Sequence, residues 1–477
     1  MNDETNIQDS QSQTTPKPEW DFGDEISNFI KHLEAQADIL PLVLRLVSVK
    51  LLQEHKHVDQ YIKKSGIQEQ PSGKDKVVKL SIPLDKIKGF IDVNEKVETT
   101  RLAHRFLPIN FVVSFVSQYD AFLGRLIRTM FISTPELLNN SEKNILFSEL
   151  TKFSSLDEAR EFVIEKEVES VLRESHLKQF KWLESKLNIT LRKDLASFSD
   201  FIEITERRNL FVHCDGVVSR QYLEVCKENH VQNIEKVVVG QKLLAKPSYT
   251  SHCYSVLFEI AVKLGQVAWR KLKPDDLLKA DNHLNNVCYE LLVKGHYKLA
   301  LKLLTFATDV LKKHHDQQMI CTLTINKALA HYLANNKEGC SKVLAMHDWS
   351  ASSDTFKLAV AVLTEDYNLA GGIMKSLGSS NTHINQDAYK EWPLFNSFRS
   401  TDQFKNTYRE IYGEELIYIE RKPRSLDDII TNIGLAEKEI VAETITALSN
   451  KSSDMEVEKA SKPKVASKRK PKTVKGE

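Results

Sequence analysis

The stretch LPINFVVSFVSQYDAFLGRLIRTMF, residues 107–131, decides the class of the fold. Its apolar residues recur at steps of three and four, as Phe111, Phe115 and Phe122 illustrate, and this is the period of an α-helix. The apolar positions cover a face so wide that such a helix must be buried against other helices. The stretch therefore predicts a long core helix in an all-α fold.

Helical spacing of apolar residues continues on both sides of this stretch. Upstream it covers residues 21–62, where Pro41 is expected to kink or divide the helix. Between the two, the alternating segment 77–82 is either an isolated strand or an extended connector. Downstream the pattern predicts four further helices, over residues 156–174, 176–187, 197–213 and 219–229.

The length of 477 residues exceeds one ordinary hydrophobic core, so two or three domains are expected. Changes in composition and periodicity suggest where the divisions fall. From the N-terminus we expect a disordered segment, a helical domain, a helical connector, a repeat region, a C-terminal helix and a disordered basic tail, over residues 1–20, 21–235, 236–275, 276–415, 416–450 and 451–477 respectively.

A spacing of small and large apolar residues recurs within the repeat region. Ala300, Cys340 and Ala370 take corresponding positions, with offsets of 40 and 30 residues. These offsets straddle the roughly 34 residues of a tetratricopeptide repeat (TPR), a pair of helices, and the region resembles a degenerate array of such repeats. The aromatic segment 391–412 is expected to form a helix that seals the end of the stack.

Charge is distributed unevenly along the chain. The formal net charge is +1, but residues 451–477 carry nine Lys and Arg against four Asp and Glu, a local net of 9 − 4 = +5. The other 450 residues therefore sum to 1 − 5 = −4. Because the folded part is not generally basic, any nucleic acid would bind at a local site, and the tail is either a solubilising segment or a contact made by charge.

Other classes of site have no support in the sequence. The six cysteines form no CxxC pair and no Cys/His cluster, so no metal site is expected and the thiols should be reduced. No phosphate-binding glycine loop or nucleophile elbow is present, and no cofactor is expected. The polar N-terminus and the lack of an apolar run of roughly 18 residues predict a cytoplasmic protein without a membrane span.

The segment Arg208-Asn209-Leu-Phe-Val-His213 carries the most specific chemistry. On a helix, Asn209 and His213 lie four residues apart on one face, and Arg208 is adjacent to them. Ser197 and Asp200 can cap the start of this helix and Gly216 should end it, which puts His213 in the last turn, where the negative helix end favours imidazolium. A histidine that moves protons beside an arginine that stabilises phosphate charge predicts metal-free RNA cleavage by the ribose 2′-OH.

This Arg-polar-x-x-x-His pattern, on the penultimate helix of an all-helical domain with a long apolar helix upstream, resembles the HEPN superfamily over about residues 21–235. The resemblance implies a helical domain that forms a homodimer. In the dimer, two copies of the motif would meet in one composite, metal-independent endoribonuclease site. Many such proteins serve as toxins or in defence against phage.

The resemblance also implies roles for individual residues. Arg208 would bind the scissile phosphate of an RNA substrate, and His213 would act as general base or acid on the 2′-OH or the leaving 5′-oxygen. Asn209 would orient the pair. The expected products are a 2′,3′-cyclic phosphate and a 5′-hydroxyl, formed without added metal.

Three further residues are weaker candidates for an accessory role at this site. The segment 119–123 is similar to the upstream helix of HEPN proteins with this arrangement, which implies that Asp120 or Arg125 faces the site. Arg207 is either a solvated neighbour or a ligand for a flanking phosphate. One departure is Asp215, which stands where some members of the family have a tyrosine, so a tyrosine-dependent subtype is not expected.

A second interpretation of the same sequence is that the protein is not a catalyst. In it, the HEPN-like domain is a dimerisation or nucleotide-sensing element and the TPR-like repeats form an adaptor. The repeats would either offer a surface to a protein partner or serve as a packing platform for the dimer.

Overall fold

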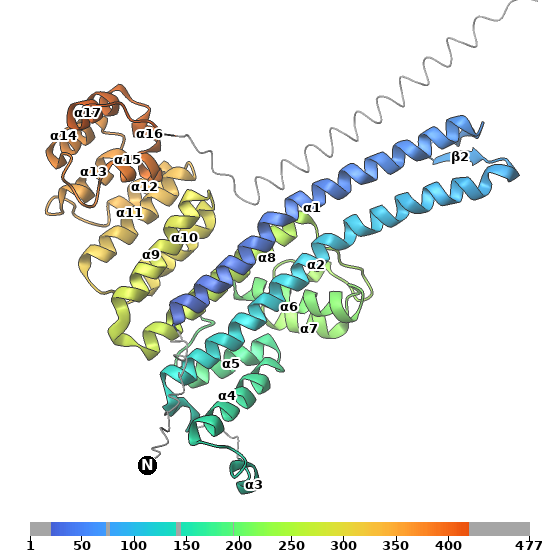
Figure 1. The fold of residues 1–477 in the computed structure, drawn as a ribbon, viewed down its shortest axis with the longest axis horizontal. Helices are drawn as coiled ribbons and strands as arrows, with labels where there is room; N and C mark the ends of the chain where they lie inside the picture. The colour runs from blue at the N-terminus through green and yellow to red at the C-terminus, as the bar shows by residue number, and fades with distance from the viewer. Residues whose placement is uncertain (1–20, 73–76, 140–144, 194, 419–477) are drawn as a thin grey trace, which may run out of the picture. The chain divides into compact units, whose positions relative to one another are not determined.

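Helices account for most of the chain described by the computed structural model, which covers residues 21–72, 77–139, 145–193 and 195–418 (Figure 1). The all-α class expected from the sequence is confirmed. The described strands form one two-stranded hairpin. All described residues belong to one compact unit.

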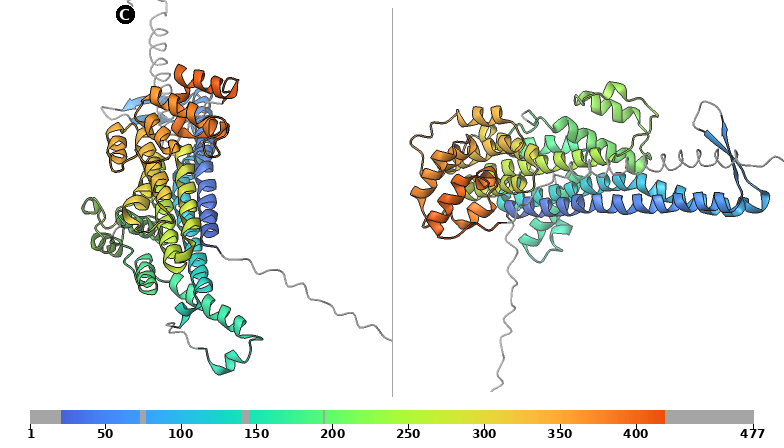
Figure 2. Two further views of the ribbon diagram at one scale, coloured as in Figure 1. Left: turned by 90° about the vertical axis from the view of Figure 1, so that its left-hand side faces the viewer. Right: turned by 90° about the horizontal axis from the view of Figure 1, so that it is seen from above.

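Two long helices, α1 (Phe22–Lys64) and α2 (Ile87–Ser133), run side by side (Figures 1 and 2). They are joined by strands β1 (Gln68–Ser72) and β2 (Val77–Ser81), which pair antiparallel, and by a 3₁₀ turn over Leu84–Lys86. The segment expected to be an isolated strand or a connector is therefore a paired strand.

The proline in α1 does not divide the helix. Pro41 lies inside one continuous helix, between Leu40 and Leu44, whose side chains are fully buried. Proline removes one hydrogen bond of the helix. Because tertiary packing supplies most of the stability of a helix in a protein, burial on both sides of the proline can hold the two halves together.

The core helix α2 begins twenty residues earlier than the sequence pattern predicted. Its buried side chains lie mostly between Pro108 and Phe131, whereas Val97 and Thr100 are the buried ones in its first half. That first half therefore has a narrow apolar stripe, as expected of a helix paired chiefly with one neighbour. The periodicity that marks a helix buried on several sides appears only in the second half.

Six further helices complete the N-terminal part, and among these six, three make most of the contacts with α2. Tyr119 and Phe122 of α2 contact the ring of Phe29 from α1, and Tyr119 also contacts Phe201 from α6. The predicted helices downstream of α2 are present with ends within two residues of those expected. The six are α3 (Phe147–Leu150), α4 (Leu156–Leu172), α5 (His176–Leu187), α6 (Phe198–His213), α7 (Arg220–Glu228) and α8 (Pro247–Leu272), with 3₁₀ turns at Pro135–Leu138, Ile234–Lys236 and Pro274–Asp276.

The predicted N-terminal cap of α6 is absent, whereas its predicted C-terminal end at Gly216 is present. Ser197 occupies the N-cap position, but its side chain makes no capping hydrogen bond and its buried Oγ has no partner among the described residues. The expected cap is wrong because Ser197 has φ −85° and ψ 5°, not the extended conformation that points an N-cap oxygen at the helix. At the other end, Gly216, with φ +77°, donates its N–H to the Leu210 carbonyl and closes the helix.

The repeat region contains three helical hairpins, each with the same turn. Their pairs are α9 (Leu277–Val293) with α10 (Tyr297–Thr305), α11 (Gln317–Leu333) with α12 (Lys337–Leu344), and α13 (Asp354–Leu363) with α14 (Tyr367–Leu377). A π-helical stretch, Phe306–Val310, follows α10. The turn residues are left-handed, with φ 84°, 58° and 61° at Gly295, Asn335 and Glu365.

The turn residues are separated along the chain by the same numbers of residues as the recurring small residues found in the sequence. Gly295, Asn335 and Glu365 are separated by 40 and 30 residues, like Ala300, Cys340 and Ala370, which are all buried. After each turn, one backbone N–H donates to the carbonyl five residues earlier, over 2.8–2.9 Å. The unequal spacing comes from the helices between the turns, since α11 has 17 residues and α13 has 10, whereas the turns themselves are alike.

The segment after the third hairpin is broken into short helices: α15 (Gln386–Glu391), a 3₁₀ turn (Pro393–Phe395), α16 (Asn396–Arg399) and α17 (Asp402–Tyr412). The single helix expected over residues 391–412 is therefore wrong, although α17 does pack on α14 at the end of the stack. Buried Arg399 donates to the carbonyls of Tyr389 and Lys390, which a continuous helix would use itself. Of the expected C-terminal helix, residues 419–450 lie outside the described part.

One described helix is long and apolar enough to cross a membrane by length and composition, the segment Leu84–Ser133 that contains α2. The core helix of a soluble protein passes the same test. Since the apolar side chains of its second half are buried among α1, α6 and α8, this helix is weak evidence for a membrane span.

Candidate functional site

The motif lies on the second half of α6, which is anchored by apolar contacts on both sides of it. Upstream, Phe201 packs edge to face against Tyr119 of α2, with ring centroids 5.0 Å apart. Within the motif, Leu210 is buried in a small core with Val218 and Tyr222, residues that follow the end of α6. These contacts fix the helix, and its polar residues Arg208, Asn209 and His213 remain at least partly accessible.

Arg208 is held by a carboxylate from α2. Its Nη2 donates to Oδ2 of Asp120 over 2.8 Å, and its side chain is 19% exposed. The other carboxylate oxygen of Asp120, Oδ1, lies 2.8 Å from Nε2 of His176, the first residue of α5. Three helices thus bring an arginine, an aspartate and a histidine together.

His176 is not among the site residues predicted from the sequence. Its partner Asp120 lies 56 residues upstream on another helix. The ring of His176 is buried beside the rings of Tyr119 and Phe201. No local pattern marks such a pair, because the contact depends on how α2, α5 and α6 pack.

A second carboxylate, Glu206, lies in the same group of charges. Burial raises its pKa, while the charges of His176 and Arg208 and a hydrogen bond from the Asn209 side chain act in the opposite direction. The net effect is a raised pKa. Asn209 therefore contacts a carboxylate one turn earlier on α6, and the sequence reasoning did not include Glu206.

His213 lies apart from this group. It is the last residue of α6 and it is exposed. Within the described residues, no hydrogen bond or ion pair links it to Arg208 or Asn209. The expected position in the last helical turn is as observed, and the ring is open to an incoming group.

Arg207 belongs to a different cluster. Its Nε donates to Oε1 of Glu203 over 2.6 Å, and its guanidinium lies 4.1 Å from the ring centre of Tyr249. Glu203 also accepts hydrogen bonds from the hydroxyls of Tyr222 and Tyr249, over 2.6 and 2.7 Å. Burial raises the pKa of both tyrosines, so they remain protonated donors. This set of bonds ties α6, α7 and α8 together.

Arg125 also has a partner away from the motif. Its Nε donates to Oε2 of Glu25 over 2.6 Å, and Glu25 is a buried residue near the start of α1. The structure thus brings Arg208 and Asp120 together and places Arg125 in the contact between α1 and α2.

The Arg208 guanidinium has donors that its bond to Asp120 does not use. A guanidinium has five N–H donors, and in Arg208 the bond to Asp120 uses Nη2 while the buried Nε has no partner among the described residues. A phosphate would compete with Asp120 for this cation. Among the residues that the structure describes, no three His, Cys, Asp or Glu side chains gather closely enough to hold a metal ion.

Comparisons with protein-family models, with curated proteins and with solved structures found no match to this chain.

Proposed function

We propose that this protein is a metal-independent endoribonuclease of the HEPN type that acts as a homodimer. The observation that carries the proposal is the placement of the motif: Arg208 is oriented by Asp120 on a fixed helix, and His213 is exposed at the end of the same helix.

In this reaction one imidazole removes the proton from a ribose 2′-OH, and the 2′-oxygen attacks the adjacent phosphorus. The bond from phosphorus to the 5′-oxygen breaks, and a protonated imidazole gives its proton to that oxygen. The two copies of His213 in a dimer supply the two roles. Arg208 stabilises the additional charge on the phosphate oxygens, and the products are a 2′,3′-cyclic phosphate and a 5′-hydroxyl.

The rest of the chain has a supporting part in this proposal. The three hairpins with identical turns support a TPR-like array, which would bind a protein partner that targets or restrains the nuclease. A cavity of about 720 Å³ opens beside α11 and α13 of this array. The biological role that we propose is that of a toxin or an anti-phage defence protein in the cytoplasm.

The test is to incubate purified protein with total and transfer RNA in EDTA and to map the ends of the fragments. Wild-type protein should leave 2′,3′-cyclic phosphates, and His213→Ala and Arg208→Ala should each lose the activity. His32→Ala, which removes an exposed histidine from α1, is the matched control and should cut normally. Equal cleavage by all four proteins would mean a contaminant or a wrong site.

A non-catalytic adaptor or nucleotide-sensing scaffold is the second candidate. The observation that favours it is that the Arg208 cation is already paired with Asp120 and lies close to the carboxyl of Glu206. A protein that remains folded and dimeric but leaves every RNA intact would support this function and count against the nuclease.

A further inference from the structure

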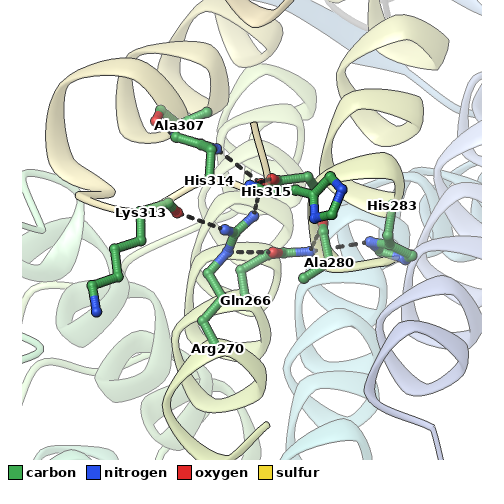
Figure 3. A network of polar contacts seen from close by, with 9 residues as sticks. Gln266, Arg270, Ala280, His283, Ala307, Lys313, His314 and His315 are labelled. Atoms are coloured by element: carbon green, nitrogen blue, oxygen red, sulfur yellow. Dashed lines mark hydrogen bonds and ion pairs between the residues drawn. The ribbon is translucent and has the colours of Figure 1, made fainter. Parts of the chain in front are cut away.

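A buried polar network lies where α8, α9 and the linker 311–316 meet (Figure 3). Its centre is Asp281, whose side chain is fully buried. One oxygen, Oδ1, accepts from Arg270 Nη2 over 2.6 Å and lies 2.9 Å from Nδ1 of His314. The other, Oδ2, accepts the backbone N–H of His315 over 2.7 Å.

The positions of the protons can be worked out from Arg270. A guanidinium only donates, so the Gln266 oxygen must face Arg270 Nε, at 3.1 Å, and the Gln266 amide nitrogen faces Nδ1 of His283, at 3.3 Å. Nδ1 of His283 is therefore an acceptor, and its Nε2 carries the proton toward Ser27 Oγ, at 3.0 Å. Burial lowers the pKa of His283, which agrees with a neutral ring.

His314, unlike His283, carries a proton on both ring nitrogens. Its Nδ1 faces the Asp281 carboxylate, and its Nε2 lies 2.9 Å from the carbonyl oxygen of Ala307. Burial alone would raise the pKa of Asp281, but hydrogen bonds from His314, from the His315 N–H and from Arg270 lower it, so this carboxyl is ionised. Neither acceptor can donate a proton, and His314 makes both bonds only as an imidazolium.

We propose that His314 is a pH-sensitive latch: as an imidazolium it fixes the linker between the first and second helical hairpins, and loss of its proton releases the linker. The proposal goes beyond the nuclease function and does not depend on it. Ala307 lies in the π-helical stretch after α10, so the latch joins that stretch to Asp281 on α9.

The charges around the ring come from three helices and from the linker itself. Arg270 on α8 opposes a second cation, and Asp281 on α9 compensates for it. On the π-helical stretch, Asp309 is paired with Lys327 of α11. Lys313 and His315 flank His314 and make backbone hydrogen bonds. The Lys313 carbonyl accepts from Arg270 Nη1, and the His315 N–H donates to Asp281.

The sign of the pH dependence follows from the proton that the closed linker holds. The closed linker requires a proton on each ring nitrogen of His314, because both nitrogens then face acceptors, so the closed form is favoured at low pH and opening increases as pH rises. One linked proton gives up to tenfold more opening per pH unit.

Hydrogen exchange on the full-length protein tests this inference. The amides of residues 306–316 should open more at pH 8 than at pH 7, by up to about tenfold, after correction for intrinsic exchange. His314→Gln should remove this pH dependence. His315→Gln is the matched control and should keep it, because Asp281 contacts the backbone N–H of that residue.

A wild-type linker whose opening does not change between pH 7 and pH 8 would overturn the latch, as would a His314→Gln protein that keeps the pH dependence. If His314→Gln does not fold, neutron diffraction from wild-type crystals at pH 7 decides the matter. Deuterons on both ring nitrogens of His314 are expected, and a deuteron on only one nitrogen would contradict the proposal.

Discussion

The contacts of Arg208 make Asp120 a test of how the candidate site is held together. Asp120→Asn keeps the shape of the side chain but removes the charge that faces both Arg208 and His176. A partly buried cation that loses its partner should cost about 1–3 kcal/mol of unfolding free energy. Denaturant unfolding checks this, with Asp157→Asn as the control.

The control removes an ion pair of another kind. Asp157 pairs with Arg160 on the surface of α4, and both side chains are about half exposed or more. Such pairs contribute roughly 0–1 kcal/mol. If the two variants lose equal stability, the bond between Asp120 and Arg208 does not hold the site.

Glu206 gives a prediction on pH. Because burial raises its pKa, ionisation of Glu206 costs stability in the folded state, and this cost is present at neutral pH and absent below the ordinary pKa of about 4.3. Glu206→Gln should therefore raise the melting temperature at pH 7 and have no such effect near pH 4. Melting curves of both proteins at the two pH values measure this, and an equal gain at both would show that ionisation is not the cause.

At the scale of single elements, two glycine-to-alanine substitutions test whether the turn of the first hairpin requires a left-handed backbone. Gly295 has φ 84°, a left-handed conformation, so Gly295→Ala should destabilise the protein by about 1–2 kcal/mol. Gly372 lies inside α14 with open space where a Cβ would be, so Gly372→Ala should stabilise it by roughly 0.5–1 kcal/mol. Chemical denaturation of both variants checks the opposite signs, and a neutral Gly295→Ala would count against the shared turn.

The elements also show how far the sequence alone could lead. Helices α4 to α7 were predicted almost to the residue, because each has its own apolar face and its own ends. The first half of α2 was missed because residues 87–106 have too narrow an apolar stripe. In the candidate site, Asn209 and His213 share a helix and were found by spacing, whereas the bond between His176 and Asp120 exists only after three helices have packed.

At the scale of the whole described chain, α8 is shared between the N-terminal helices and the repeat region. It packs on α1, α2 and α6 and also on α9 and α10. Trp269 of α8 stacks on Phe22 of α1, and Lys302 of α10 pairs with buried Glu259 of α8. A helix with partners on both sides should make the two regions unfold together.

Gly265 in α8 tests this cooperativity. A Cβ at this position would lie 2.6 Å from the side chain of Ile26 of α1, so Gly265→Ala must displace that side chain or the helix that carries it, at a cost of about 1–3 kcal/mol. Because α8 serves both regions, hydrogen exchange should show the same loss of protection in α6 and in α11, and calorimetry should show one transition at a lower temperature. Loss of protection in α6 alone, with a second transition that keeps the wild-type temperature, would mean that the repeats fold independently of α8.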